Sequence, residues 1–218
     1  MKRFKTLVYG FLAGICIALG GTVFLSLDNK IVGSLLFTVG LFTICTQGFN
    51  LFTGKVCYVF ERDKSYAIDL PFIWIGNLLG CLFFGGLLLC TRVAPALTEK
   101  AAGIAATKLG DSPLSIFLLS AFCNMLIFIA VDGFNNGKHE LGKYLALFFG
   151  IMVFILCGFE HCVANMFYFT VAKAWSGKAI LYLLLMTVGN AVGGVIIPLL
   201  RMFYNHKKEE KQAAAAAK

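Results

Sequence analysis

Charged residues are scarce in this chain of 218 residues. They make up 14% of the sequence, whereas hydrophobic residues make up 59%, and the mean hydropathy is +0.84. These values lie outside the range of soluble globular domains. The polar connections are short as well, since the longest of them, Arg92–Ser112, leaves no room for a soluble domain. The composition therefore predicts a protein embedded in a membrane.

Several chemical motifs are also missing from the sequence. No Cys-x-x-Cys pair occurs, and most of the eight cysteines lie inside apolar runs, where a free thiol packs as a small hydrophobic group. No metal site and no cofactor are therefore expected. No His-Glu-x-x-His motif and no nucleophile beside a base are found, which argues against an enzyme. Because no small-residue cleavage site follows the first apolar run, no secretory signal peptide is expected.

What the sequence does contain is six apolar runs long enough to cross a bilayer as helices, which takes about 20 residues each. The runs are Leu7–Leu27, Ile31–Phe60, Ile68–Cys90, Pro113–Val131, Tyr144–Ala172 and Ile180–Tyr204. The second and fifth runs are long and interrupted. We therefore predict one all-α transmembrane domain over residues 1–212. The Ala213–Ala217 run with Lys218 is expected to be a disordered or helical tail, 213–218.

The basic residues predict the orientation of this domain. With six spans, both termini lie on one side of the membrane. That side would carry Lys2, Arg3, Lys5, Arg62, Lys64, Lys138, Lys143, Arg201, Lys207, Lys208 and Lys211, and the other Lys30, Arg92, Lys100, Lys108, Lys173 and Lys178. Because Lys and Arg accumulate on the cytoplasmic side, both termini are expected in the cytoplasm, with the protein in the cell membrane. The net charge of +8 then reflects topology, and nucleic acid is not an expected partner.

The two interruptions carry the same small signature. The first begins Gly48-Phe49-Asn50 and the second Gly158-Phe159-Glu160, and the next span after each contains Gly-Asn-x-x-Gly, at 76–80 and 189–193. Each half, about 7–90 and 113–204, holds an odd number of spans, so the second half must enter the membrane from the opposite side. This pattern predicts an inverted 3+3 repeat with broken second and fifth helices, as in many transporters. Most of the flanking glycines are expected to serve helix packing.

Breaks of this kind indicate a transport site near the middle of the membrane. Unpaired backbone groups are tolerated there only where protein or a watery cavity satisfies them. The broken helices also direct their N-termini, which carry partial positive charge, toward a central point. Such a point favours an anion. The sequence therefore predicts passage of a small anion.

Ionisable residues inside membrane spans are usually functional, and the second break carries two of them. We expect His161 to face the pathway and Glu160 to hold the broken backbone through hydrogen bonds. The alternative is a histidine satisfied by a neighbour such as Asn190, without a role in transport. Thr53 at the first break is the natural partner of His161, although it could simply cap the half-helix that follows.

Other polar residues near the breaks have two interpretations each. Asn124, Asn165 and Asn190 lie within spans, where they either hold the loops or line the path. Lys108 lies on the outer side, sixteen residues before Asn124. It either raises the local anion concentration at a pore mouth or is an ordinary solvated loop lysine.

Four segments together resemble the formate/nitrite transporter family, which includes hydrosulfide channels. They are Asn50–Lys55 (NLFTGK), Phe122–Val131 (FCNMLIFIAV), Gly158–Phe167 (GFEHCVANMF) and Val188–Gly194 (VGNAVGG). The resemblance covers almost the whole chain. It implies an aquaporin-like protomer, assembled as a homopentamer, in which each protomer has its own pore for a small monovalent anion such as formate, nitrite or hydrosulfide.

The resemblance also implies roles for individual residues. Matching family positions in the substrate pathway are His161 (the central histidine), Thr53, Lys108, Asn124, Glu160, Asn165 and Asn190, and those in the apolar constrictions are Phe37, Leu41, Leu51, Phe52 and Phe154. The chain departs from the family pattern at Asn50, where an acidic residue is common, and at Lys55, where a neutral one is more usual. Thr170 replaces an expected proline, and the helix that often precedes the first span is missing or reduced to Met1–Thr6.

An anion in a dry apolar slit costs many kcal/mol, whereas its neutral acid crosses easily. In one version of the mechanism His161 supplies a proton to the anion or hydrogen-bonds it. In the other, His161 stays neutral and the substrate takes its proton from water. Two other classes stay open as alternatives: a membrane-embedded enzyme that uses Glu160 and His161 as an acid–base pair, and a water or glycerol channel, although the Asn-Pro-Ala loops of such channels are missing.

Overall fold

A computed structural model of the chain describes residues 2–216, with side chains through residue 207. Over that range the regular structure is helical, which confirms the all-α prediction. The helices are α1 (Lys2–Ser26), α2 (Lys30–Gln47), α3 (Phe52–Val56), α4 (Lys64–Leu88), α5 (Ala94–Gly110), α6 (Pro113–Asn136), α7 (Glu140–Leu156), α8 (Cys162–Val171) and α9 (Gly177–Ala216). Met1 and the last two residues of the predicted tail, 217–218, lie outside the described residues.

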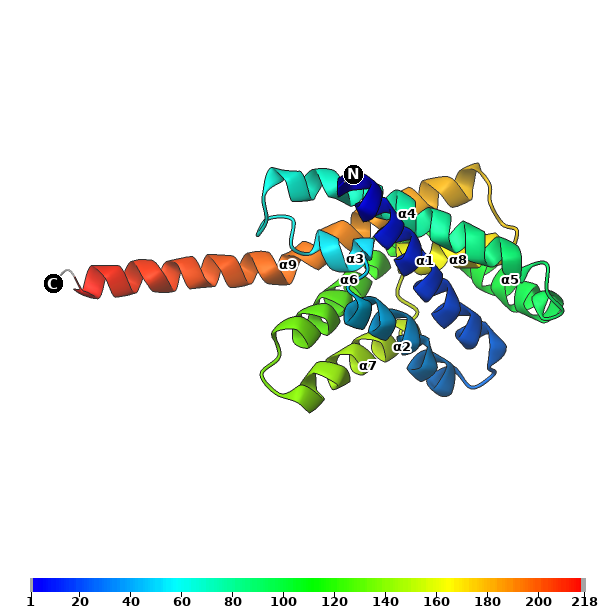
Figure 1. Cartoon of the computed structure of the whole chain (residues 1–218), viewed down its shortest axis with the longest axis horizontal. Helices are drawn as coiled ribbons and strands as arrows, with labels where there is room; N and C mark the ends of the chain where they lie inside the picture. The colour runs from blue at the N-terminus through cyan, green and yellow to red at the C-terminus, as the bar shows by residue number, and fades with distance from the viewer. Residues whose placement is uncertain (1, 217–218) are drawn as a thin grey trace.

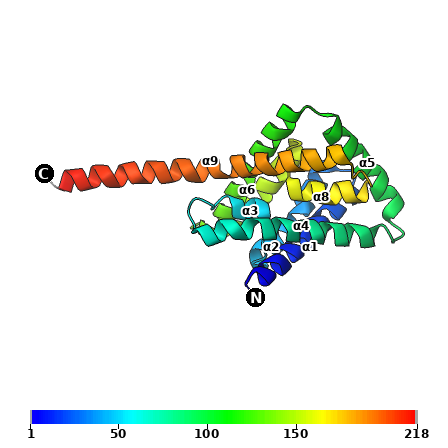
Figure 2. The same cartoon turned by 90° about the horizontal axis from the view of Figure 1, so that it is seen from above.

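The predicted apolar runs correspond to these helices, two of them in pieces. Among the described residues, α1, α2, α4, α6 and α9 are long and apolar enough to cross a membrane. The second run consists of α2, a break and the short α3, and the fifth consists of α7, a break and α8. Figure 1 shows α2 and α7 side by side at the bottom of the bundle, and they are in contact. In Figure 1 and Figure 2, α9 extends well beyond the helices on which it packs.

Most of the connection Arg92–Ser112 is a helix, α5, which lies between the spans α4 and α6. Ala94, Leu97, Ala101 and Ala105 form its buried side, spaced three or four residues apart as on one helix face. That side packs on α8 and α1. As a result, the basic residue at the end of α5, Lys108, is held near the second break instead of on a free loop.

Both breaks start at a glycine in the left-handed conformation. Gly48 has φ of 69° and Gly158 has φ of 70°, a region that side chains other than glycine rarely adopt. At each glycine the amide of the next residue donates to a carbonyl in the last turn of the preceding helix, which ends the helix and redirects the chain. The shared Gly-Phe signature in the sequence thus corresponds to the same local backbone geometry.

The Gly-Asn-x-x-Gly segments let neighbouring helices come into close contact. They lie on α4 and α9, which pack against α1 and α6 respectively. A Cβ atom added at Gly80 would overlap backbone atoms of Phe11 and Gly14 on α1. The expected packing role of these glycines agrees with that contact. The same close approach brings Asn77 and Asn190 of the two segments next to the breaks.

Candidate functional site

The two breaks meet at a hydrogen bond between Thr53 and His161. The Thr53 Oγ1 and His161 Nε2 atoms are 2.9 Å apart, and both residues are buried. They come from different halves of the chain, since Thr53 lies in α3 and His161 immediately precedes α8. The structure therefore brings together the pair that the sequence suggested. Phe154 stacks on the imidazole ring, with the ring centroids 5.6 Å apart.

The other ring nitrogen of His161 determines which tautomer is present. His161 Nδ1 lies 3.0 Å from the backbone nitrogen of Ala164 and accepts its N–H, so the histidine caps α8. An accepting Nδ1 carries no proton, so the ring is neutral, its proton is on Nε2, and it donates to Thr53 Oγ1. The Thr53 hydroxyl keeps its own hydrogen to donate. Thr53 does not cap α3 with its side chain, because the N-cap residue of that helix is Leu51.

Asn77 anchors the first break. Its Oδ1 accepts from the Phe52 amide at 2.8 Å, and its Nδ2 donates to the carbonyls of Asn50 (2.9 Å) and Gly10 (2.8 Å). The side chain is fully buried. These bonds satisfy backbone groups that would otherwise be costly in a membrane. Asn77 was not among the predicted site residues, although the Gly-Asn-x-x-Gly motif was the signal that could have identified it.

Asn190 anchors the second break in the same way. Its Oδ1 accepts from the Cys162 amide at 2.9 Å, and its Nδ2 donates to the carbonyls of Glu160 (2.8 Å) and Ser120 (2.7 Å). Asn190 thus binds the backbone on both sides of His161. The alternative in which Asn190 satisfies the imidazole does not describe this geometry, since both ring nitrogens have other partners.

Glu160 has a different task from the expected one. Its Oε2 lies 2.6 Å from Lys108 Nζ and 2.7 Å from Asn165 Nδ2, so the carboxylate binds side chains, while Asn190 holds the broken backbone. The side chains of Lys108 and Glu160 are only 13% and 5% exposed. Lys108 is therefore not a solvated loop lysine, and its charge is balanced by the adjacent carboxylate.

Asn124 supports the first break from α6. Its Nδ2 donates to the Thr53 carbonyl at 3.0 Å, and its Oδ1 is buried without a protein partner among the described residues. Asn124 therefore fixes the backbone of Thr53. With Asn77 and Asn190, it belongs to the residues that hold the loops.

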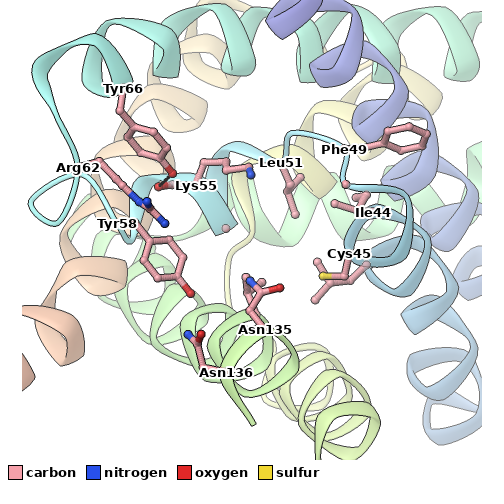
Figure 3. Close-up of a pocket in the computed structure, with 14 residues that line it drawn as sticks. Ile44, Cys45, Phe49, Leu51, Lys55, Tyr58, Arg62, Tyr66, Asn135 and Asn136 are labelled. Carbon is pink, nitrogen blue, oxygen red and sulfur yellow. Dashed lines mark hydrogen bonds between the residues drawn. The ribbon is translucent and has the colours of Figure 1, made fainter. Parts of the chain in front are cut away.

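Two cavities adjoin the Thr53–His161 pair and share no lining residue: His161 itself lines one, and Leu51 and Gly54, next to Thr53 in the chain, line the other. The Lys108 cavity, of about 260 Å³, is lined by Phe24, Lys30, Phe37, Ile104, Thr107, Lys108, Phe154, Ile155, Gly158, Phe159, Glu160, His161, Ala164, Asn165 and Tyr168. The Lys55 cavity, of about 420 Å³ and drawn in Figure 3, is lined by Leu41, Ile44, Cys45, Gly48, Phe49, Leu51, Gly54, Lys55, Tyr58, Arg62, Tyr66, Val131, Asn135 and Asn136.

The predicted constriction residues separate into two groups. Phe37 and Phe154 line the Lys108 cavity and pack edge to face, with ring centroids 6.3 Å apart. Leu41 and Leu51 line the Lys55 cavity and are buried. Phe52 is also buried and is not among the lining residues of either cavity. Apolar side chains thus flank the polar pair on both sides.

A buried polar pair between two cavities, with apolar side chains on each side and broken membrane helices around it, defines a channel or transporter for a small solute. The chain belongs to the formate/nitrite transporter family, because the model of that family, described as formate/nitrite transporter, matches residues 1–204. It is a multi-pass membrane protein. The relatives that match it are named as transporters and channels, which sets the enzyme alternative aside.

Individual comparisons agree with this assignment. An uncharacterized transporter, YrhG of Bacillus subtilis, is 33% identical, with 96% of this chain and 90% of that protein covered. A solved FNT family ion channel superposes with a TM-score of 0.78 at 26% identity, covering 93% of this chain and 89% of the other. A solved pentameric formate channel with formate bound has the same fold, with a TM-score of 0.76, 24% identity and coverage of 93% and 96%.

Proposed function

We propose that this protein is a homopentameric channel of the cell membrane for small monovalent weak-acid anions, namely formate, nitrite or hydrosulfide, with proton exchange at His161. The observation that carries the proposal is the buried Thr53–His161 pair between two cavities. The Lys and Arg bias supports cytoplasmic termini. The inverted 3+3 repeat is part of the proposal, and the matching contacts of Asn77 and Asn190 support it.

The apolar side chains on both sides of the pair decide which form of the substrate passes. Phe37 and Phe154 on one side and Leu41 and Leu51 on the other offer no hydrogen bonds to a charged solute. An unpaired anion among them loses its hydration without compensation, whereas a neutral acid loses much less. A protonation step at the polar centre is therefore the least costly way past them.

The tautomer of His161 indicates how such a step begins. A second proton can bind only at Nδ1, and it would displace the Ala164 N–H from that atom. A buried imidazolium also needs a counter-charge. An anion next to the ring supplies that charge. We therefore expect the proton and the anion to be taken up together, after which the anion leaves as its neutral acid.

Flux measurements on purified protein in liposomes test the proposal. Formate, nitrite, hydrosulfide and chloride are compared at two pH values, and the weak acids are expected to pass while chloride is not. In the His161→Asn variant, proton-coupled flux is expected to fall on the order of 100-fold, the usual contribution of a positioned proton donor. Asparagine keeps an acceptor for the Ala164 N–H but does not titrate.

The matched control is His139→Asn, because His139 is an exposed histidine at the start of α7. Its flux and pH dependence are expected to equal those of the wild type. If the His161→Asn protein is folded and its proton coupling is unchanged, the substrate takes its proton from water and proton exchange at His161 is wrong. If the wild type passes none of the weak acids, the proposed function itself fails.

A further inference from the structure

The Lys55 cavity holds two cationic side chains that the pathway described above does not use. Lys55 comes from α3, two residues after Thr53, and Arg62 comes from the turn before α4. Figure 3 shows both on one wall of the cavity, with the Lys55 amine directed across it toward Leu51. No aspartate or glutamate is among the lining residues. The cavity therefore carries an excess of positive charge.

The two cavities differ in how their cations are balanced. On the opposite side of the Thr53–His161 pair, the Lys108 amine forms a buried ion pair with Glu160 at 2.6 Å. Lys55 and Arg62 form no ion pair with any carboxylate of the described side chains. The Lys108 cavity thus has one cation without an ion pair among the described side chains, the exposed Lys30, beside the neutralised Lys108–Glu160 pair. The Lys55 cavity has two such cations and no lining carboxylate, so its excess of positive charge is larger.

Asp132, a carboxylate in contact with the lining residues Tyr58 and Asn136, is engaged elsewhere. Asp132 accepts two hydrogen bonds from the Arg201 guanidinium, at 2.8 and 3.2 Å, and one from Asn136 Nδ2 at 2.8 Å. Tyr58 donates to the same carboxylate at 3.4 Å. Asp132 is therefore occupied by Arg201, so it does not cancel the charge of Lys55.

Hydrogen bonds also hold the backbone of Lys55 in place. The Tyr66 hydroxyl donates to the Lys55 carbonyl at 2.7 Å, and the Tyr58 amide donates to the same carbonyl at 3.2 Å. The carbonyl is thus satisfied by protein, and the side chain extends into the cavity from a fixed point. Asn135 and Asn136 on the facing wall add amide groups that can donate to an anion.

We propose that the Lys55 cavity is a binding station for a small monovalent anion at the mouth of the pathway opposite Lys108. The Lys55 amine would provide the charge, and Arg62 would extend the attraction toward solvent. This inference rests on the proposed function. A volume of about 420 Å³ is much larger than such an anion, so the ion keeps part of its water and binds weakly. Weak binding suits a channel, in which the ion must also leave.

Zero-trans formate flux, measured from each side in membrane vesicles of both orientations, tests this station. In Lys55→Met, the half-saturating formate concentration measured from the Lys55 side is expected to rise about 10-fold, the lower end of the gain that electrostatic steering gives. The value measured from the Lys108 side is expected to change by less than about twofold. Lys55→Arg, which keeps the charge, is expected to retain the wild-type value on both sides.

The matched control is Lys64→Met, because Lys64 is an exposed lysine at the start of α4 and does not line the cavity. It is expected to leave both half-saturating concentrations unchanged. A second measurement needs no variant: raising the ionic strength from about 10 mM to about 100 mM shortens the Debye length from about 30 Å to about 10 Å. The wild-type half-saturating concentration is then expected to rise more from the Lys55 side than from the Lys108 side.

The outcomes separate the station from the proposed function. If the wild type carries no formate, nitrite or hydrosulfide, the proposed function fails. If the wild type carries formate, but Lys55→Met and Lys64→Met behave alike and salt acts equally from both sides, the station is wrong and the proposed function stands. If Lys55→Met does not fold, the station is tested by the half-saturating formate concentration of Arg62→Gln, measured from each side, and by the salt dependence of the wild type.

Discussion

Replacing Glu160 by Gln is expected to lower the free energy of unfolding by about 3–5 kcal/mol, the usual cost of removing one partner from a buried ion pair. The Lys108 amine, with a side chain only 13% exposed, would be left with an uncompensated charge. Lys108→Met leaves the negative charge without its partner instead, since the Glu160 carboxylate then has no cation beside it and is even more buried. Both single variants are therefore expected to be strongly destabilised.

The double variant Lys108→Met/Glu160→Gln is expected to recover most of the lost stability, because no charge then stays buried. The measurement is the midpoint of unfolding in detergent for the wild type, both single variants and the double variant. Additive effects would contradict the buried pair, because they would show that the two side chains do not interact.

The control for this cycle is the exposed ion pair between Lys100 and Asp28. Its atoms are 2.7 Å apart, but Asp28 is almost completely exposed, and solvent screens such pairs. Lys100→Met is therefore expected to leave the unfolding midpoint unchanged. Equal losses for Lys100→Met and Lys108→Met would show that burial does not determine the cost.

The pairing of Lys108 with Glu160 marks the limit of what the sequence could predict. The two residues are 52 positions apart and lie on different elements, so no local pattern relates them. The charge of Lys108 could be recognised from the sequence, but its partner depends on the packing of α5 against α8. For this reason the sequence suggested an anion-attracting lysine, whereas the structure contains a neutralised one.

The breaks were predictable in more detail, because their geometry depends on short local segments. Gly48 and Gly158 end their helices by a backbone conformation that glycine adopts without strain, and the Gly-Phe pair in each half indicates it directly. The predicted inverted repeat suggested the juxtaposition of Thr53 and His161, and the two side chains are hydrogen-bonded in the structure. The bond that His161 Nδ1 accepts from the Ala164 amide was not predicted, although it is a local capping contact, because histidine is not among the preferred N-cap residues.

Gly193→Ala is expected to be the other severely destabilising substitution, because it would separate α6 from α9. A Cβ atom at this position overlaps the backbone carbonyl and Cα of Ala121 on α6, and backbone atoms cannot rotate away. Overpacking of a tight interior typically costs about 1–3 kcal/mol, and we expect a loss at or above the upper value here. The amount of folded protein in detergent and its unfolding midpoint measure the loss.

The consequence of Gly193→Ala should extend to transport. Asn190 lies one helical turn before Gly193 on the same face of α9, and it holds the backbone on both sides of His161. A shift of α9 would lengthen those bonds, so any folded Gly193→Ala protein is expected to carry less formate than the wild type. Gly80→Ala, which meets Phe11 and Gly14 in the first half, should act likewise on Asn77 and the first break.

Gly86→Ala is the matched control for both glycine variants. Gly86 also lies inside α4, but a Cβ atom added there meets nothing within 4 Å among the described residues. Alanine in a helix interior is favoured over glycine by roughly 0.5–1 kcal/mol, so this variant is expected to equal or slightly exceed the wild type in stability. If Gly193→Ala and Gly86→Ala have the same unfolding midpoint and formate flux, close contact between α6 and α9 does not hold Asn190 at the second break, and the link between helix packing and the site is wrong.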